Sequence, residues 1–126
     1  MIKYILLLHT IIELAGGLVL IFRPETLMLS EALTLPAGSV IKLFGVAVVC
    51  IGVLSLLMYQ RFSYSERDKL AVLLFMGYHM IQGFQCYGMY TAQVMENMGA
   101  FTLHMTLALF FLIAYMKESQ LFPEKK

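Results

Sequence analysis

Residues 4 to 22 read YILLLHTIIELAGGLVLIF, an apolar run long enough to cross the hydrocarbon core of a bilayer as one α-helix. Three further apolar runs follow at residues 40 to 59, 70 to 90 and 99 to 116. Because a membrane span must satisfy its own backbone hydrogen bonds, each run is expected to be an α-helix. The sequence therefore predicts an all-α fold, an integral membrane, antiparallel four-helix bundle that forms a single domain over residues 1 to 126.

The composition of the whole chain agrees with this prediction. Of the 126 residues, 60% are hydrophobic and only 13% are charged, and the mean hydropathy is +0.80. A water-soluble domain of this length could not bury so much apolar surface, whereas lipid tolerates it. The formal net charge of +1 argues against a nucleic-acid-binding protein, and the chain carries no phosphate-binding loop or familiar hydrolase motif. The sequence thus indicates membrane lipid as the surroundings and favours a non-enzymatic protein.

The basic residues predict an orientation, because Lys and Arg beside a span resist translocation. With four spans, seven of the nine Lys and Arg residues would lie on the side of the termini, and only Arg23 and Lys42 would lie on the other. We therefore expect a multi-pass protein of the bacterial inner membrane with cytoplasmic N and C termini. Residues 26 to 36 are too short to span and are expected to lie in the outer interface as a short amphipathic helix or turn. Before the third run, Ser65 or Asp68 is the expected helix N-cap.

Polar side chains inside the apolar runs are the most informative residues, because an ionisable group in hydrocarbon costs about 2.5 kcal/mol or more unless it faces protein or water. His9 and Glu13 are four residues apart and share one face of the first helix. The fourth run contains His104. The third run carries a polar stripe made of Tyr78, His79, Gln82, Gln85 and Cys86.

Depth in the membrane indicates that these groups meet. At 1.5 Å per residue, Glu13 and His79 each lie roughly 13 Å from the cytoplasmic end, and His104 lies roughly 18 Å deep, level with Gln82. His9 lies one turn nearer the cytoplasm, where the expected partial hydration makes a specific role less favoured than for the others. The candidates for binding a ligand or a proton are therefore Glu13, His79, Gln82, His104, His9, Tyr78 and Gln85.

Several chemistries suit these residue types. Imidazole and carboxylate groups ligate metal ions, relay protons, or bind the polar head of a ligand such as a quinone, and histidines on two helices ligate haem in membrane cytochromes. They also serve simply as interhelical hydrogen-bonding groups. Spacing along the sequence does not choose among these roles, because the residues come from different helices.

The second run has a different character. It has no buried acid or base, but Gly45, Gly52 and Ser55 form a face of small residues that lets helices approach closely.

These features of the sequence lead to two functional hypotheses. The first is a non-enzymatic subunit, or a bundle that binds a partner or ligand, whose glycine face packs within its own bundle or against another chain, a second copy included. The alternative is a quinone-, haem- or metal-binding redox protein that uses the intramembrane Glu/His/Gln cluster.

The chain also resembles the small four-helix bacterial membrane proteins described as DoxX-like. The resemblance is carried by Phe22-Arg23-Pro24-Glu25 after the first run and by Ile41-Lys42-Leu43-Phe44-Gly45 at the start of the second. A basic loop before the third run and histidines in the third and fourth runs add to it. The resemblance implies the four-helix membrane architecture. Some members of that group are linked to quinone-dependent sulfur oxidation, but no motif in this chain carries that activity over.

Overall fold

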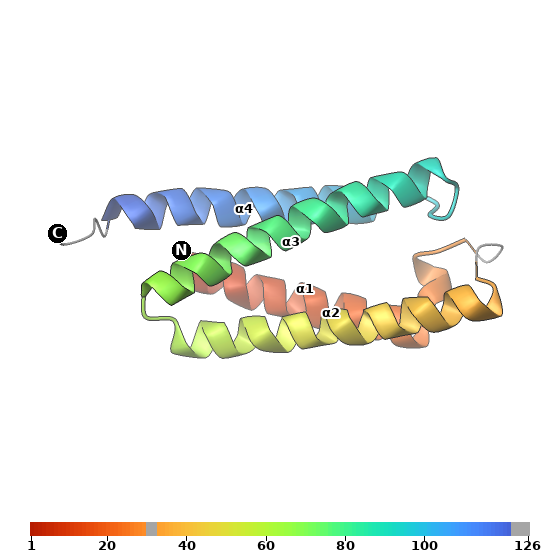
Figure 1. Cartoon of the computed structure of the whole chain (residues 1–126), viewed down its shortest axis with the longest axis horizontal. Helices are drawn as coiled ribbons and strands as arrows, with labels where there is room; N and C mark the ends of the chain where they lie inside the picture. Colours follow the sequence, from red (N-terminus) through yellow and green to blue (C-terminus); the bar gives the residue numbers. More distant parts are fainter. Residues whose placement is uncertain (30–32, 122–126) are drawn as a thin grey trace.

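In a computed structural model, which describes residues 1 to 29 and 33 to 121, the chain forms an all-α fold of four long helices (Figure 1). The helices are α1 (Ile2–Phe22), α2 (Leu35–Arg61), α3 (Glu66–Thr91) and α4 (Gly99–Leu121), with a short 3₁₀ turn, η1 (Pro24–Thr26), after α1. Each predicted apolar run lies within one helix. α2 begins at Leu35, before the predicted start, because a proline such as Pro36 is tolerated in the first turn of a helix.

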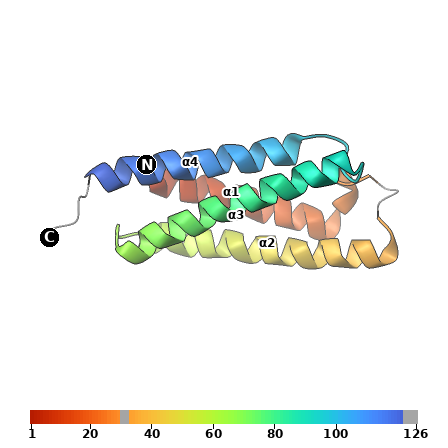
Figure 2. The same cartoon turned by 45° about the horizontal axis from the view of Figure 1, so that its top comes forward.

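The helices pack as two antiparallel hairpins. α1 packs along α2, and α3 packs along α4. Figures 1 and 2 show the two hairpins side by side, with the N terminus and the last turns of α4 at the same end of the bundle. The four-helix, all-α prediction is confirmed.

Within the described residues, three helices are long and apolar enough to cross a membrane, namely Ile2–Phe22, Pro36–Arg61 and Gly99–Lys117. Large hydrophobic side chains cover their outer surfaces, as lipid requires; Leu18, Val46 and Leu109 are examples. α3 is of comparable length but less apolar, because its first turns carry charged residues and its middle carries the polar stripe. The chain is therefore a small multi-pass membrane protein with three strong candidate spans.

Close contact between glycines holds α1 against α2. A Cβ atom added to Gly17 would lie 2.8 Å from the backbone oxygen of Gly45, and one added to Gly45 would lie 2.9 Å from the backbone oxygen of Gly17. A Cβ atom on Gly52 would lie 3.1 Å from Leu14. The glycine face of α2 thus packs within its own bundle, against α1.

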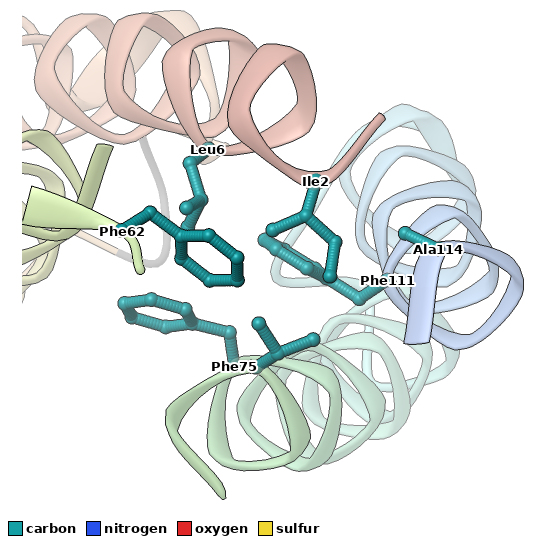
Figure 3. Close-up of a cluster of buried hydrophobic side chains, with 7 residues drawn as sticks. Ile2, Leu6, Phe62, Phe75, Phe111 and Ala114 are labelled. Carbon is teal, nitrogen blue, oxygen red and sulfur yellow. The ribbon is translucent and has the colours of Figure 1, made fainter. Parts of the chain in front are cut away.

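Two hydrophobic clusters fill the ends of the bundle. The first lies near the N terminus, where side chains from α1, α3, α4 and the end of α2 converge (Figure 3). Its buried members are Ile2, Leu6, Phe62, Val72, Phe75, Phe111 and Ala114. The second lies at the opposite end and contains Leu20, Met28, Val48 and Met95. The interior between these clusters is where the polar side chains gather.

Of the segment predicted to lie in the outer interface, residues 27 to 29 form a turn, whereas Leu35 and Pro36 already belong to α2. After η1, Met28 is buried in the second cluster, and the Leu29 backbone N–H donates a hydrogen bond to the Val94 carbonyl at 3.0 Å. This bond joins the connection after α1 to the connection before α4. Ser30, Glu31 and Ala32, which belong to the same prediction, lie outside the described residues.

The start of α3 confirms the predicted cap. The Ser65 hydroxyl accepts a hydrogen bond from the Asp68 backbone N–H, and the Asp68 carboxylate accepts one from the Ser65 backbone N–H. Both candidate residues therefore take part, in a reciprocal capping box.

Candidate functional site

A layer of polar side chains crosses the bundle interior between the two hydrophobic clusters. This polar layer consists of His9 and Glu13 from α1, Ser55 from α2, Tyr78 and His79 from α3, and His104 from α4. It contains all three histidines of the chain. Four of its members are buried, whereas Tyr78 and His104 are half-buried. The layer thus reaches the surface on the side of α3 and α4.

Ser55 determines which nitrogen of His9 carries a hydrogen. The Ser55 hydroxyl donates to the Leu6 backbone carbonyl at 2.9 Å, so its single hydrogen is already used. The His9 Nδ1 atom, 2.9 Å from the same hydroxyl oxygen, must therefore be the donor in that contact. A neutral imidazole has one N–H group, so the Nε2 atom of neutral His9 presents a lone pair.

Glu13 lies at the centre of the layer, and its side chain is only 2% exposed. Its Oε1 atom is 3.5 Å from His9 Nε2 on the same helix and 3.9 Å from His79 Nε2 on α3. Its other oxygen, Oε2, accepts a hydrogen bond from the Tyr78 hydroxyl at 3.1 Å. One carboxylate therefore links α1 to α3 through two different side chains.

His79 extends the layer to α4. Its Nδ1 atom lies 2.9 Å from His104 Nδ1, so one of these nitrogens donates and the other accepts. Aromatic rings pack against the histidines. The ring centroids of Phe75 and His9 are 4.8 Å apart, and Phe111 stacks on His79 with ring centroids 5.9 Å apart. The histidine rings are thus held by hydrocarbon as well as by hydrogen bonds.

Two buried nitrogen atoms in this layer are left without a hydrogen bond. Among the described residues, His9 Nε2 and His79 Nε2 are the buried side-chain polar atoms that lack a hydrogen-bond partner. Each is near the same carboxylate oxygen, Glu13 Oε1. A buried polar group without a partner costs about 1 to 3 kcal/mol, and native interiors leave few of them. An arrangement that served only to join helices would be expected to satisfy both atoms.

The predicted site residues divide into two groups. Glu13, His79, His104, His9 and Tyr78 are brought together, and His9 is completely buried rather than partly hydrated. Of the other two, Gln82 is half-buried and Gln85 is exposed. Among the described side chains, no hydrogen bond or ion pair joins either of them to the layer. The stripe on α3 is broad, and among the described side chains Tyr78 and His79 make its polar contacts with α1.

Sequence reasoning assigned Ser55 only to a packing face and missed its contact with His9. The available signal was its position, one turn beyond Gly52 on the face that approaches α1. The two cysteines take no part in the layer. Cys50 is exposed on α2, and Cys86 is half-buried on α3.

Comparisons with known proteins add no identity. No family model, no curated protein and no solved structure matches the chain. The resemblance to DoxX-like proteins therefore has no support from these comparisons, and the polar layer itself is the basis for a function.

Proposed function

We propose that this chain is a non-enzymatic inner-membrane protein that binds a small ligand in its polar layer. In this proposal all four helices span the membrane and both termini are cytoplasmic. The observation that carries it is the pair of buried, unpartnered Nε2 atoms of His9 and His79 beside the Glu13 carboxylate. Binding of a ligand would satisfy atoms that the folded chain leaves unsatisfied.

The surroundings of the layer favour a closed site over a path through the membrane. The contacts run across the bundle, from Ser55 on α2 to His104 on α4, rather than along its axis. Hydrophobic clusters occupy the bundle interior towards both ends. A proton path would need polar groups or water along the membrane normal.

Contact between the histidine rings disfavours haem. The ring centroids of His9 and His79 are 4.7 Å apart, and those of His79 and His104 are 5.2 Å apart. A macrocycle with axial histidines would have to separate these rings. The polar head of a quinone would meet Tyr78 and His104 first, since these are the half-buried members of the layer.

Packing and length support the proposed fourth span. α3 runs antiparallel to α4, and its 26 residues extend about 39 Å as an α-helix. Its polar residues Tyr78 and His79 face other helices of the chain rather than lipid.

A partner chain would not bind at the glycine face of α2, because α1 occupies that face. A partner or a second copy would contact the exposed apolar surfaces instead.

Native mass spectrometry tests the ligand site without assuming what the ligand is. The wild-type protein, extracted in mild detergent, is expected to carry a bound mass that Glu13→Gln lacks. Gln85→Leu is the control, because Gln85 is a polar residue of α3 that lies outside the layer. A wild-type chain that carries no added mass, or a mass that all three proteins share, contradicts the proposal.

Reporter fusions test the topology. A reporter placed after Lys126 is expected to be active in the cytoplasm, and one placed in the connection at residues 93 to 98 is expected to be active outside it. A reporter after Lys126 that is active outside the cytoplasm contradicts the four-span arrangement.

A further inference from the structure

We propose that the ligand of the polar layer is a divalent first-row transition-metal ion, bound by His9 Nε2, Glu13 Oε1 and His79 Nε2. This inference rests on the proposed ligand-binding function and names the ligand class. The three side chains are all buried, and one candidate ligand atom from each lies within 4.8 Å of the others.

The separations suit a metal ion that sits among the three atoms. Metal bonds of about 2.0 to 2.1 Å in a tetrahedral site put neighbouring ligand atoms about 3.3 Å apart. The observed distances from Glu13 Oε1 are 3.5 Å to His9 Nε2 and 3.9 Å to His79 Nε2. Small side-chain rotations close the difference. Three protein ligands would leave a further coordination position for water or another small molecule.

The hydrogen bonds around the ligands are those that support metal sites. A histidine that ligates a metal through one nitrogen donates a hydrogen bond from the other nitrogen, which fixes its tautomer and orientation. His9 Nδ1 donates to Ser55, and His79 Nδ1 has His104 Nδ1 as its partner. The second oxygen of Glu13 accepts from Tyr78. His9 Nδ1, His79 Nδ1 and Glu13 Oε2 thus have partners, whereas the two histidine Nε2 atoms without a hydrogen bond both lie near Glu13 Oε1.

The ligand atoms also indicate the class of metal. Two imidazole nitrogens and one carboxylate oxygen suit Zn²⁺, Fe²⁺, Mn²⁺, Co²⁺ or Ni²⁺, whereas Cu⁺ prefers thiolate and thioether sulfur. No cysteine sulfur belongs to this group among the described residues. Ser55 and His104 act as positioning residues. Ser55 contacts Nδ1 of His9, and His104 contacts Nδ1 of His79; in each ligating histidine this is the nitrogen that would not face the metal.

Cobalt binding, with zinc as the competitor, tests this inference on the full chain in detergent. The affinity tag must contain no histidine. The three native histidines, which all lie in the polar layer, are then the only histidines present, so binding by a tag cannot be mistaken for binding at the site. We expect the wild-type protein to bind one Co²⁺ per chain, with the visible absorption of a low-symmetry site, and Zn²⁺ to displace it. Glu13→Gln and His79→Gln are each expected to weaken binding by at least about 100-fold.

The positioning residue and the control sharpen the test. His104→Gln is expected to weaken Co²⁺ binding by about 10-fold while one ion per chain still binds, as loss of an outer-shell partner does. Gln85→Leu is expected to bind as the wild type does. Circular dichroism and gel filtration establish that each variant is folded. Should Glu13→Gln not fold, His79→Gln carries the same test.

The outcomes separate this inference from the proposed function. Wild-type protein that binds neither Co²⁺ nor Zn²⁺, while native mass spectrometry detects an organic ligand that depends on Glu13, overturns the metal and leaves the ligand site in place. Metal binding that persists unchanged in Glu13→Gln and His79→Gln overturns the assignment of ligands. Absence of both metal binding and any bound mass overturns both proposals.

Discussion

The two faces of α1 make opposite kinds of contact. Towards α2, Gly17 lets the backbones approach so closely that an added Cβ atom would overlap the neighbouring helix. Towards α3, the helices meet through the long side chains of Glu13, Tyr78 and His79. The first face leaves no room for anything between the helices. The second face keeps space between the helices, and side chains that donate and accept hydrogen bonds fill it.

This difference separates stability from function. Close packing of small residues stabilises membrane helices through van der Waals contact, with no polar group left unsatisfied. The polar face instead leaves two buried nitrogens without hydrogen bonds, at a cost in stability. In the proposed function, the glycine face stabilises the packing of α1 on α2, and the polar face binds the ligand. Substitutions on the glycine face should therefore lower mainly the free energy of unfolding, whereas substitutions on the polar face should also weaken ligand binding.

The largest effect is expected at the glycine face. Gly17→Val places a branched side chain where a Cβ atom alone would lie 2.7 Å from Val49 Cγ2 and 2.9 Å from the Val49 backbone nitrogen. Because backbone atoms cannot move aside, α1 and α2 must separate. We expect a loss of about 3 kcal/mol in the free energy of unfolding, measured by denaturing-detergent titration.

Gly16→Val is the matched control, because a Cβ atom on Gly16 meets nothing within 4 Å. Its effect should stay within about 0.5 kcal/mol. Equal losses at both positions would show that helix propensity, and not the contact with α2, decides the result.

The next effect is expected at the centre of the polar face. Glu13→Leu removes the acceptor of the Tyr78 hydroxyl and the carboxylate that lies near both histidine Nε2 atoms. We expect a loss of about 1 to 3 kcal/mol in the metal-free protein, measured by thermal melting. Glu13→Gln keeps an acceptor oxygen of similar shape, so its metal-free stability should change by less than about 1 kcal/mol. A Glu13→Leu protein as stable as the wild type would place Glu13 outside the bundle interior.

A smaller loss is expected where the two faces meet. Ser55 comes from α2, yet its hydroxyl lies between the Leu6 carbonyl and His9 Nδ1. Ser55→Ala removes both bonds and is expected to cost about 1 kcal/mol in a thermal melt and to weaken metal binding by about 10-fold. Cys50→Ala, an exposed small residue on the same helix, serves as the control. Full metal affinity in Ser55→Ala would mean that ring packing, on Phe75 and Phe111 among others, keeps His9 in its orientation without the Ser55 hydroxyl.

The architecture was predictable from the sequence because it depends on local properties. The length of apolar runs identifies helices one at a time, and Gly45 and Gly52 mark a close-packing face through their spacing within α2. The cap of α3 depends on residues within one turn: of the two candidates, Ser65 is the N-cap, and Asp68 is its partner at N3. None of these predictions needs the distance between two helices.

The site was only partly predictable because it depends on several helices at once. Depth counted along each helix brought Glu13 and His79 together correctly, but it placed His104 level with Gln82 rather than beside His79. His9 was expected near water, and instead the first hydrophobic cluster shields it. The contact between Ser55 and His9 depends on rotation of α2 about its axis, which no pattern in α1 contains.

The smallest effect is expected at the capping box of α3, which is remote from both faces of α1. A substitution there tests whether the polar face depends on the stability of α3. Burial acts to raise the pKa of the Asp68 carboxyl, but hydrogen bonds from Ser63 and Ser65 outweigh it and hold the pKa below its ordinary value of 3.8. A depressed folded-state pKa means that the contribution to stability is present above pH 3.8 and is lost as the pH falls through the folded-state pKa. At neutral pH, Asp68→Asn should therefore lower the free energy of unfolding, measured by thermal melting. The expected loss is roughly 0.5 to 1 kcal/mol, because the site is largely solvated. The difference should shrink below pH 3.8. Metal affinity should not change at neutral pH, and a loss there would mean that α3 must be firmly capped for His79 to meet Glu13.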